Sequence, residues 1–309
     1  MFVVCGEALM DVFAAGDTPT GTTLDARVGG SPFNVAVGLA RLGQPVAFFS
    51  AISSGFLGER LMQALRTEGV DCSTVARPQA PTTLGLVGLD AQGVPSYSFY
   101  GDNCADRLLD AGALALLPGK ISALQVGSFA TVVQPVAATL RTLIERECQR
   151  TPVCYDPNVR LNVEPALEPW REMLHWMLPR THLLKISEED LHLLRPGVSP
   201  ERFAGEALAA GVGLVVVTRG AEGAAAWTRK AEAAVPAQSL TVVDTVGAGD
   251  TFQAALLTWL AERDCLSIER IPVLSSAQLH EAVGFAVGAA AITCSRRGAD
   301  LPRRSELPR

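Results

Sequence analysis

The chain has 309 residues, of which 48% are hydrophobic, so it can bury a full core and is not intrinsically disordered. Its formal net charge of −6 argues against a nucleic-acid-binding surface, which would need a basic face. We find no apolar run of about 18 residues and no basic-then-apolar terminal segment, and therefore expect a soluble, cytoplasmic protein without a membrane partner. The seven cysteines are scattered and lack a CxxC pair, which favours reduced thiols over disulfides or zinc ligands.

The chain begins with a predicted strand and an exposed segment. Residues 1–9 contain a continuous apolar run typical of a buried strand. Asp11 follows this strand, at the edge where open α/β sheets bind ligands. Residues 12–28 are rich in Gly, Thr and Asp, which predicts a loop with short strands.

A glycine pair and a helix of small residues come next. Gly29 and Gly30 would allow the backbone to approach a ligand closely. A helix is expected from Asn34 to a C-cap at Gly43. The Asn34 side chain offers both a donor and an acceptor, which suits a ligand hydroxyl. A tightly packed helix that contacts no ligand is the alternative.

Residues 45–101 predict a strand, a helix and a hairpin. The strand covers 45–53, the helix covers 59–68, and the hairpin joins 82–90 to 95–101. Tyr97 and Phe99 alternate with smaller residues and give one strand an aromatic face. From the residues alone, this aromatic face is expected to pack on the body of the protein.

From residue 111 the pattern alternates between strands and helices. Such alternation predicts a doubly wound, mainly parallel α/β sheet with crossover helices, and no linker or repeat divides the chain. The expected strands are residues 123–129, 152–158, 181–187, 214–220 and 240–243.

The stretch from 240 to 260 carries the strongest chemical signal. Gly247 and Gly249 separate the last predicted strand from an apolar helix face, so backbone N–H groups converge where the helix dipole is positive. This arrangement predicts an anion site. Asp250 would be costly beside an anion unless it acts as a general base, although a helix-capping or first-turn acid is the plain alternative.

Several motifs together resemble the ribokinase-like, or PfkB, family of sugar and nucleoside kinases. DTVGAGDTF, from Asp244 to Phe252, is similar to the C-terminal family signature. VGGSPFNVAVGLARLG, from Val28 to Gly43, resembles the N-terminal signature. SFYGDNCAD, which begins at Ser98, resembles bacterial fructokinases especially. The sequence has none of the P-loop, protein-kinase or serine-hydrolase motifs.

The resemblance implies one domain spanning residues 1–309, with a small β lid built from about 12–28 and 84–103. It implies that Asp250 is the base and that the turn of Gly247, Ala248 and Gly249 holds the transferred phosphoryl group. The other residues implied to contact the sugar are Asp11, Gly29, Gly30, Asn34, Tyr97, Phe99 and Arg160. Arg160 lies in DPNVR, where a structural ion pair with Asp156 is the alternative.

ATP, Mg²⁺ and a monovalent cation such as K⁺ are also implied. Lys185 would reach the nucleotide phosphates, or else be an exposed lysine at a helix start. Where relatives carry Asn-x-x-Glu for Mg²⁺, this chain has Ser187 and Asp190, so either Asp190 or Glu189 would order the metal. The remaining nucleotide contacts are expected at Thr218, Gly220 and Gly223. The monovalent cation is expected at the backbone near Asp244, Val246, Arg296 and Gly298.

The expected function is ATP-dependent phosphorylation of a primary hydroxyl of fructose. 2-Keto-3-deoxygluconate, ribose and nucleosides are alternative substrates within the family. A sugar- or nucleotide-binding regulator without catalysis is the alternative from another class. If the lid leaves an apolar face exposed, two lids would pair in a homodimer.

Overall fold

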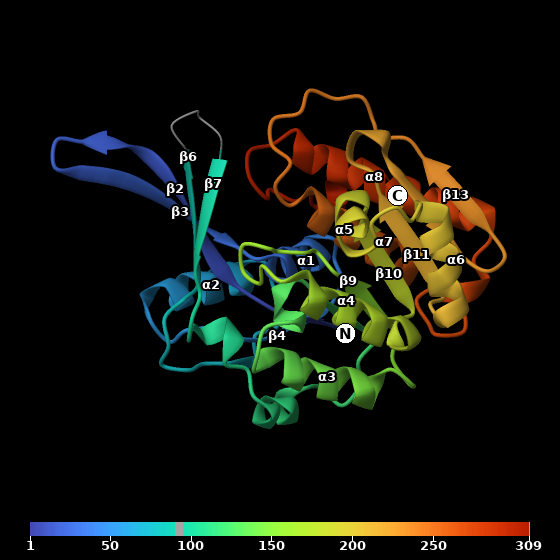
Figure 1. The fold of residues 1–309 in the computed structure, drawn as a ribbon, viewed down its shortest axis with the longest axis horizontal. Helices are drawn as coiled ribbons and strands as arrows, with labels where there is room; N and C mark the ends of the chain where they lie inside the picture. Colours follow the sequence, from blue (N-terminus) through green and yellow to red (C-terminus); the bar gives the residue numbers. More distant parts are fainter. Residues whose placement is uncertain (90–94, 309) are drawn as a thin grey trace.

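A nine-stranded sheet forms the centre of the molecule (Figure 1). The computed structural model describes residues 1–89 and 95–308. Seven neighbouring strands, from β11 to β5, are parallel, and β12 and β13 extend one edge in antiparallel fashion. The order across the sheet is β13 (Glu232–Val235), β12 (Ala224–Trp227), β11 (Leu214–Thr218), β10 (Leu183–Ser187), β9 (Val153–Asp156), β8 (Ala123–Gly127), β1 (Phe2–Cys5), β4 (Val46–Ala51) and β5 (Val75–Ala76).

The strand order reverses direction at β1. From β1 the chain adds β4 and β5 on one side, and then returns to add β8 to β11 on the other. Ligands of open α/β sheets bind at the carboxyl edge beside such a switch point. The predicted doubly wound, mainly parallel sheet is therefore confirmed, and its topology places the ligand edge at the ends of β1, β8 and β9.

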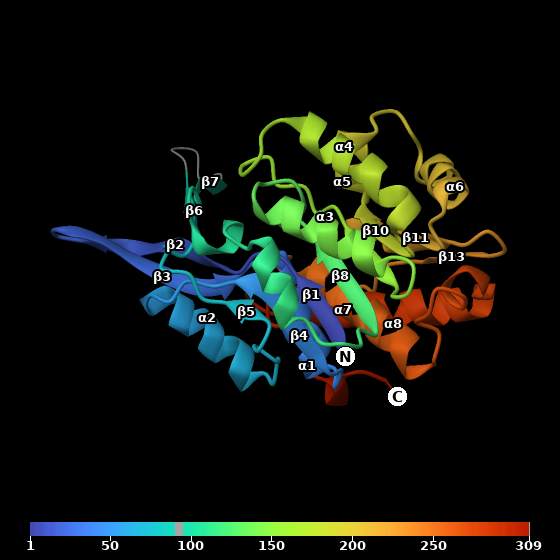
Figure 2. The ribbon, with the colours of Figure 1, turned by 90° about the horizontal axis from the view of Figure 1, so that it is seen from below.

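Helices cover both faces of this sheet (Figure 2). Helices α1 (Ser31–Arg41), α2 (Phe56–Thr67), α7 (Ala248–Glu262) and α8 (Ser276–Cys294) lie on one face. Helices α3 (Val136–Glu147), α4 (Leu167–Met177), α5 (Glu188–Leu194) and α6 (Pro200–Ala210) lie on the other. Because the parallel strands are apolar on both sides, they contribute side chains to two separate cores, one under each helical layer.

Short 3₁₀ turns connect several of these elements. They are η1 (Ala105–Arg107), η2 (Ala111–Leu116), η3 (Phe129–Thr131), η4 (Leu178–Arg180), η5 (Gly220–Glu222), η6 (Ile271–Val273) and η7 (Arg304–Glu306). None of the helices within residues 1–89 and 95–308 combines the length and the hydropathy needed to cross a membrane.

A second, four-stranded sheet projects from the carboxyl edge of the large one (Figure 1). Its order is β3 (Gly21–Gly29), β2 (Leu9–Thr18), β6 (Leu84–Leu89) and β7 (Pro95–Tyr100). The two segments expected to form a lid thus share one sheet, whose closure over a ligand stays a prediction. The expectation of loop and short strands over 12–28 is wrong, because β2 and β3 form a long antiparallel hairpin. The connection between β6 and β7, expected at 91–93, lies outside the described residues.

Two further boundaries differ from expectation. Residues 240–243 form no strand, and Val242 and Val243 are 61% and 58% exposed. A β-branched run forms a strand only where it can pair with the free edge of a neighbouring strand. Residues 240–243 pair with no strand of either sheet. Helix α1 begins at Ser31, three residues before Asn34, because Pro32 suits the first turn of a helix.

Candidate active site

The predicted anion site is the start of α7. Gly247 is the N-cap, with a φ of 78°, and a Cβ at this position would lie 2.7 Å from the Cβ of Ala299. Both the left-handed conformation and the close packing therefore require glycine here. No side chain caps the helix, and the Ala248 amide donates to the carbonyl of Thr245 at 3.2 Å. The amides of Gly249 and Asp250 are therefore the ones available to an anion, and the helix dipole favours negative charge there.

Asp250 lies in the first turn of α7, and its carboxylate is held by the start of α1. The Ser31 hydroxyl donates to Oδ1 at 2.6 Å, and the Asn34 amide donates to Oδ2 at 2.8 Å. The capping alternative is therefore wrong, because these oxygens bond to α1 and not to the N–H groups of α7. Asn34, which was expected at the sugar, faces Asp250 in this structure.

The electrostatic surroundings of Asp250 suit a base. Burial is the largest influence and raises its pKa above the ordinary value. The hydrogen bonds from Ser31 and Asn34 act in the opposite direction, as do the charges of Lys185 and Arg160. A carboxylate that holds a proton more readily than an exposed one is better matched to general base catalysis near neutral pH.

Lys185 extends from β10 to the same turn. It is 4% exposed, and its Nζ lies 2.7 Å from Oδ2 of Asp156 at the end of β9. The same Nζ lies 3.2 Å from where a Cβ of Gly249 would be. Burial alone would lower the pKa of Lys185, but Asp156, Asp190 and Asp250 hold it above its ordinary value. The expectation of an exposed lysine at a helix start is therefore wrong, and a buried cation borders the anion site.

Arg160 lies amid carboxylates without pairing to one. Its Nη1 donates to the carbonyl of Val159 at 3.0 Å, and among the described residues its guanidinium forms no ion pair. The alternative in which Asp156 and Arg160 form an ion pair is wrong, because Asp156 pairs with Lys185. Burial raises the pKa of Asp11 to about 6, and the charge of Arg160 opposes that rise.

The sugar-contact candidates near the second sheet share one corner. Asp11, Gly85 and Phe99 are register neighbours on β2, β6 and β7. A Cβ at Gly85 would lie 3.0 Å from Oδ1 of Asp11 and 3.2 Å from the Phe99 ring. A Cβ at Gly29 would lie 2.2 Å from Oδ2 of Asp11. The glycines therefore make room for the Asp11 carboxylate, while the side chain of Tyr97 lies outside what the structure describes.

Gly30 is fixed by a second constraint. Its φ is 108°, and a Cβ there would lie 2.8 Å from the carbonyl oxygen of Glu7. The connection from β1 to β2 therefore packs directly against the connection from β3 to α1. The backbone of both reaches the edge where Asp11 and Asp250 lie.

The structure separates the two acids considered for Mg²⁺. Asp190 is 8% exposed, accepts the Val159 amide at 3.2 Å, and is coupled electrostatically to Asp156, Lys185 and Arg160. Burial, helped by Asp156, raises its pKa to about 6. Glu189 is exposed and lines a surface groove on α5 instead.

The residues near Asp190 fit a magnesium ion that is coordinated mainly by a bound nucleotide. Within residues 1–89 and 95–308, His, Cys, Asp and Glu form no group of three or more that could hold a metal. Asp156 retains a buried oxygen, Oδ1, without a hydrogen-bond partner. Because Mg²⁺ commonly uses one or two carboxylates together with substrate phosphates, these residues suit it only in company with a nucleotide.

The nucleotide candidates at the end of β11 have different environments. Thr218 ends the strand, and Gly220 has a φ of 50° with open space around its missing side chain. Gly223 is confined instead, since its Cβ would lie 2.0 Å from the carbonyl oxygen of Val235. Gly220 thus borders an accessible edge, whereas Gly223 allows the backbone of β12 and the segment after β13 to pack.

Three of the four residues expected near a monovalent cation are joined directly. The Asp244 carboxylate accepts the amide of Val246 at 3.0 Å and that of Gly298 at 2.8 Å. These bonds bring the loop before α7 beside the turn after α8. Arg296 lies in the same turn, where its side chain pairs with Glu306 and Asp300.

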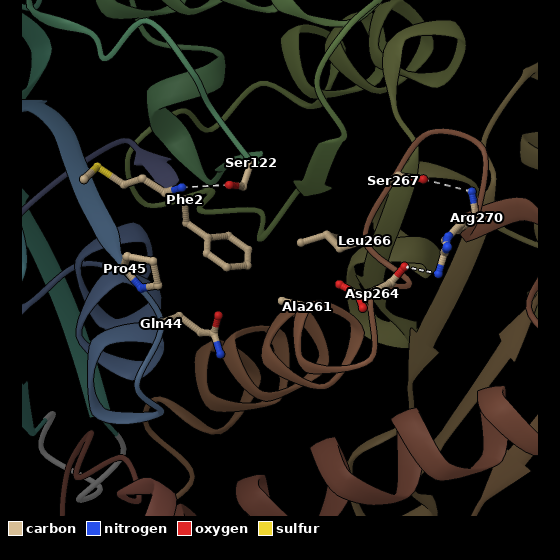
Figure 3. Close-up of a pocket in the computed structure, with 10 residues that line it drawn as sticks. Phe2, Gln44, Pro45, Ser122, Ala261, Asp264, Leu266, Ser267 and Arg270 are labelled. Carbon is tan, nitrogen blue, oxygen red and sulfur yellow. Dashed lines mark hydrogen bonds between the residues drawn. The ribbon is translucent and has the colours of Figure 1, made fainter.

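A separate cavity of about 480 Å³ opens at the opposite edge of the sheet (Figure 3). It lies where β1 begins, and its lining includes Phe2, Pro45, Ser122 and Arg270. The Met1 ammonium donates to the Ser122 hydroxyl at 2.7 Å. None of the residues predicted to bind or react lines this cavity.

Sequence reasoning missed two residues of the site. Ser31 stands inside the quoted signature, and a hydroxyl at the first position of a helix was its available signal. Glu7 is 1% exposed, with an unpartnered Oε2, and burial raises its pKa to about 7. The acid within an otherwise apolar strand end was the signal for Glu7.

A doubly wound α/β fold with a buried carboxylate and a buried cation at an uncapped helix start is suited to phosphoryl transfer to a hydroxyl. The family described as pfkB family carbohydrate kinase matches residues 1–306. The fructokinase of Rhizobium leguminosarum bv. trifolii is 33% identical over 311 residues, covering 99% of this chain and 92% of that protein. The chain therefore belongs to the pfkB family of carbohydrate kinases.

Solved structures agree with this assignment. The crystal structure of fructokinase from Xylella fastidiosa aligns with a TM-score of 0.87 and 26% identity, covering 99% of this chain and 96% of that chain. Fructokinase from Vibrio cholerae O395, in its fructose-, ADP- and calcium-bound form, aligns with a TM-score of 0.79 and 27% identity over the same shares. The ribokinase-like fold predicted from the sequence is thus confirmed.

Proposed function

We propose that this carbohydrate kinase transfers the γ-phosphoryl group of ATP to a primary hydroxyl of fructose. The observation that carries the proposal is the buried Asp250 carboxylate, fixed by two hydrogen bonds at a helix start suited to an anion. Similarity to fructokinases, such as that of Rhizobium leguminosarum bv. trifolii, supports fructose as the sugar. The Xylella fastidiosa fructokinase has been crystallised with bound ATP.

In the proposed reaction, Asp250 accepts the proton of the sugar hydroxyl as that oxygen attacks the γ-phosphorus. The bond from the γ-phosphorus to the β,γ-bridging oxygen breaks, and ADP leaves with that oxygen. The amides of Ala248, Gly249 and Asp250 would donate to the oxygens of the phosphoryl group in transit. Each such donor is typically worth about 3–4 kcal/mol in a transition state. Lys185 lies beside Gly249 and supplies a positive charge to the same oxygens.

The sugar would lie between the two sheets. Asp11 accepts hydrogen bonds from its hydroxyls, and the backbone at Gly29 and Gly30 approaches it closely. The Phe99 ring supplies an apolar surface next to Asp11. Arg160, which has no carboxylate partner among the described residues, is available to donate to the sugar or to a phosphate.

The nucleotide would lie across the ends of β10 and β11, with Thr218 and Gly220 at its side. Asp190 would hold Mg²⁺ through its water shell, and the ion when bound would neutralise charge on the phosphates. The turn tied together by Asp244 would present carbonyl groups to a monovalent cation. A mutant fructokinase from Vibrio cholerae was crystallised with fructose, ADP and a potassium ion, which supports K⁺ as the candidate.

ATP turnover with a panel of sugars tests the proposal. ADP release is measured with fructose, ribose, 2-keto-3-deoxygluconate and adenosine, and we expect the highest kcat/KM with fructose. A higher kcat/KM with another member would retain the mechanism and replace the substrate. If the protein binds ATP but releases no ADP with any member of the panel, the result would contradict the proposal and favour a non-catalytic binding protein.

We also propose that two copies pair through the second sheet. Leu24, Val28 and Tyr100 lie on this sheet and are 53%, 37% and 59% exposed, and β3 presents a free edge. Light scattering of the purified protein should give the mass of a dimer. Replacing Leu24 by Lys should shift that mass towards the monomer, whereas a monomeric native protein would contradict the proposal.

A further inference from the structure

We propose that Ser31 is a positioning residue that acts through Asp250 and makes no contact with the sugar. The proposal rests on the role of Asp250 as the base. Its basis is the 2.6 Å hydrogen bond from the Ser31 hydroxyl to Oδ1 of Asp250, which joins two residues that lie 219 positions apart.

The bond joins the starts of two helices that pack together. Ser31 is the first residue of α1, and Asp250 lies in the first turn of α7. The N-cap of α1 is Gly30, which has no side chain to cap the helix. Ser31 follows it at the first helical position and directs its hydroxyl across to Asp250. The Ser31 hydroxyl therefore holds the carboxylate and does not cap its own helix.

Two bonds fix the carboxylate better than one. Asn34 donates to Oδ2 and Ser31 donates to Oδ1, so rotation of the group about its Cβ–Cγ bond would break both. Each carboxylate oxygen can accept two hydrogen bonds, so one position on each remains for the sugar hydroxyl. Ser31 therefore sets the direction in which Asp250 faces the hydroxyl. This orientation contributes to kcat and not to the affinity for the sugar.

Ser31 also sets the protonation of Asp250. Its hydrogen bond is the first of the influences that oppose the effect of burial, followed by those of Asn34, Lys185 and Arg160. Without the hydroxyl, burial would act with less opposition and the pKa of Asp250 would rise further. A base with a raised pKa loses activity at a higher pH as the solution is acidified.

The test compares Ser31→Ala with Ser31→Thr, which keeps a hydroxyl. We expect Ser31→Ala to lower kcat for the best sugar about tenfold at pH 6, since hydrogen bonds to charged groups are among the stronger ones. The acid limb of the pH profile of kcat/KM should move to higher pH, and the sugar KM should stay within about twofold. Ser31→Thr should restore both kcat and the limb.

Ser275→Ala is the matched control. Ser275 caps the N-terminus of α8. The other end of this helix, at Cys294, is the end that contacts the loop before α7, because the Cys294 carbonyl accepts the amides of Val243 and Asp244. Its replacement should cost about 1 kcal/mol of stability and leave the pH profile unchanged. A structural effect of Ser31→Ala would resemble this control.

The Asp250→Asn background separates the two proposals. If Ser31 acts through the carboxylate, adding Ser31→Ala to Asp250→Asn should lower the residual kcat less than twofold. A rise of the sugar KM in Ser31→Ala, or an unmoved acid limb, would overturn the role of Ser31 while leaving that of Asp250 intact. Full turnover by Asp250→Asn alone would instead overturn the proposed function.

Discussion

Lys185 and Asp156 form an ion pair that is buried on both sides, with 2.7 Å between Nζ and Oδ2, and it borders the start of α7 at Gly249. Two parallel strands, β10 and β9, carry the two partners. Burial of such a pair contributes little net stability, because desolvation of both charges offsets their attraction. Lys185 therefore has two proposed roles. It neutralises the buried Asp156 carboxylate, and it places a positive charge beside the predicted anion site.

Replacement of Lys185 by Met should separate its effect on stability from its effect on turnover. The single variant leaves the Asp156 carboxylate buried without its partner, so we expect a loss of about 3–5 kcal/mol in the free energy of unfolding, measured with urea. The double variant Asp156→Asn/Lys185→Met removes the unpaired charge and should recover most of that loss. Neither should recover turnover, since the cation at Gly249 is missing from both. A fully active double variant would show that Lys185 serves the fold alone.

Glu7→Gln should make the protein more stable at alkaline pH. Burial raises the pKa of Glu7 to about 7, from 4.5 in an exposed setting. Between these values the folded protein holds a proton that the unfolded chain has lost, so the stability of the native protein falls as the pH rises. Glutamine cannot ionise and removes that fall.

We therefore expect the stability of Glu7→Gln relative to the native protein to increase by on the order of 2 kcal/mol between pH 5 and pH 8. Thermal unfolding at the two pH values measures this difference. The exposed Glu189→Gln is the control and should show no such change. Equal differences at both pH values would contradict a buried, proton-holding Glu7.

Gly29→Ala should weaken sugar binding. The new Cβ would lie 2.2 Å from Oδ2 of Asp11, so the carboxylate must move from its present place. We expect the sugar KM to rise about 10- to 100-fold, as for loss of a hydrogen bond to a charged group. Gly21→Ala, in the same hairpin, meets nothing closer than 3.7 Å and should leave KM unchanged. An unchanged KM in Gly29→Ala would contradict the role of Asp11.

Much of the fold could be read from the sequence because its signals are local. The apolar runs of β1, β4 and β11 predicted buried strands, and their alternation with helices predicted the parallel sheet. The run at 240–243 failed because strand formation depends on a neighbouring edge, which no local pattern reports. The hairpin of β2 and β3 was underestimated because its exposed strands carry few large apolar residues.

The site could be predicted in part. Motifs located Asp250, Lys185 and Asp11, which the structure places in the first turn of α7, in β10 and in β2. The partners of these residues could not be predicted, because Asn34 and Ser31 meet Asp250 only through tertiary packing of α1 on α7. Similarly, DPNVR placed Asp156 next to Arg160 in the sequence, but the fold pairs Asp156 with Lys185 on the adjacent strand.

The turnover of Asp250→Asn with fructose and ATP tests the central claim most directly. Asparagine keeps the shape of the side chain and the donors around it, but cannot accept the proton. We expect kcat to fall by ~10²–10⁴-fold, with the KM for fructose changed less than about threefold. Turnover within tenfold of the native enzyme, by a variant with an unaltered unfolding temperature, would contradict the account.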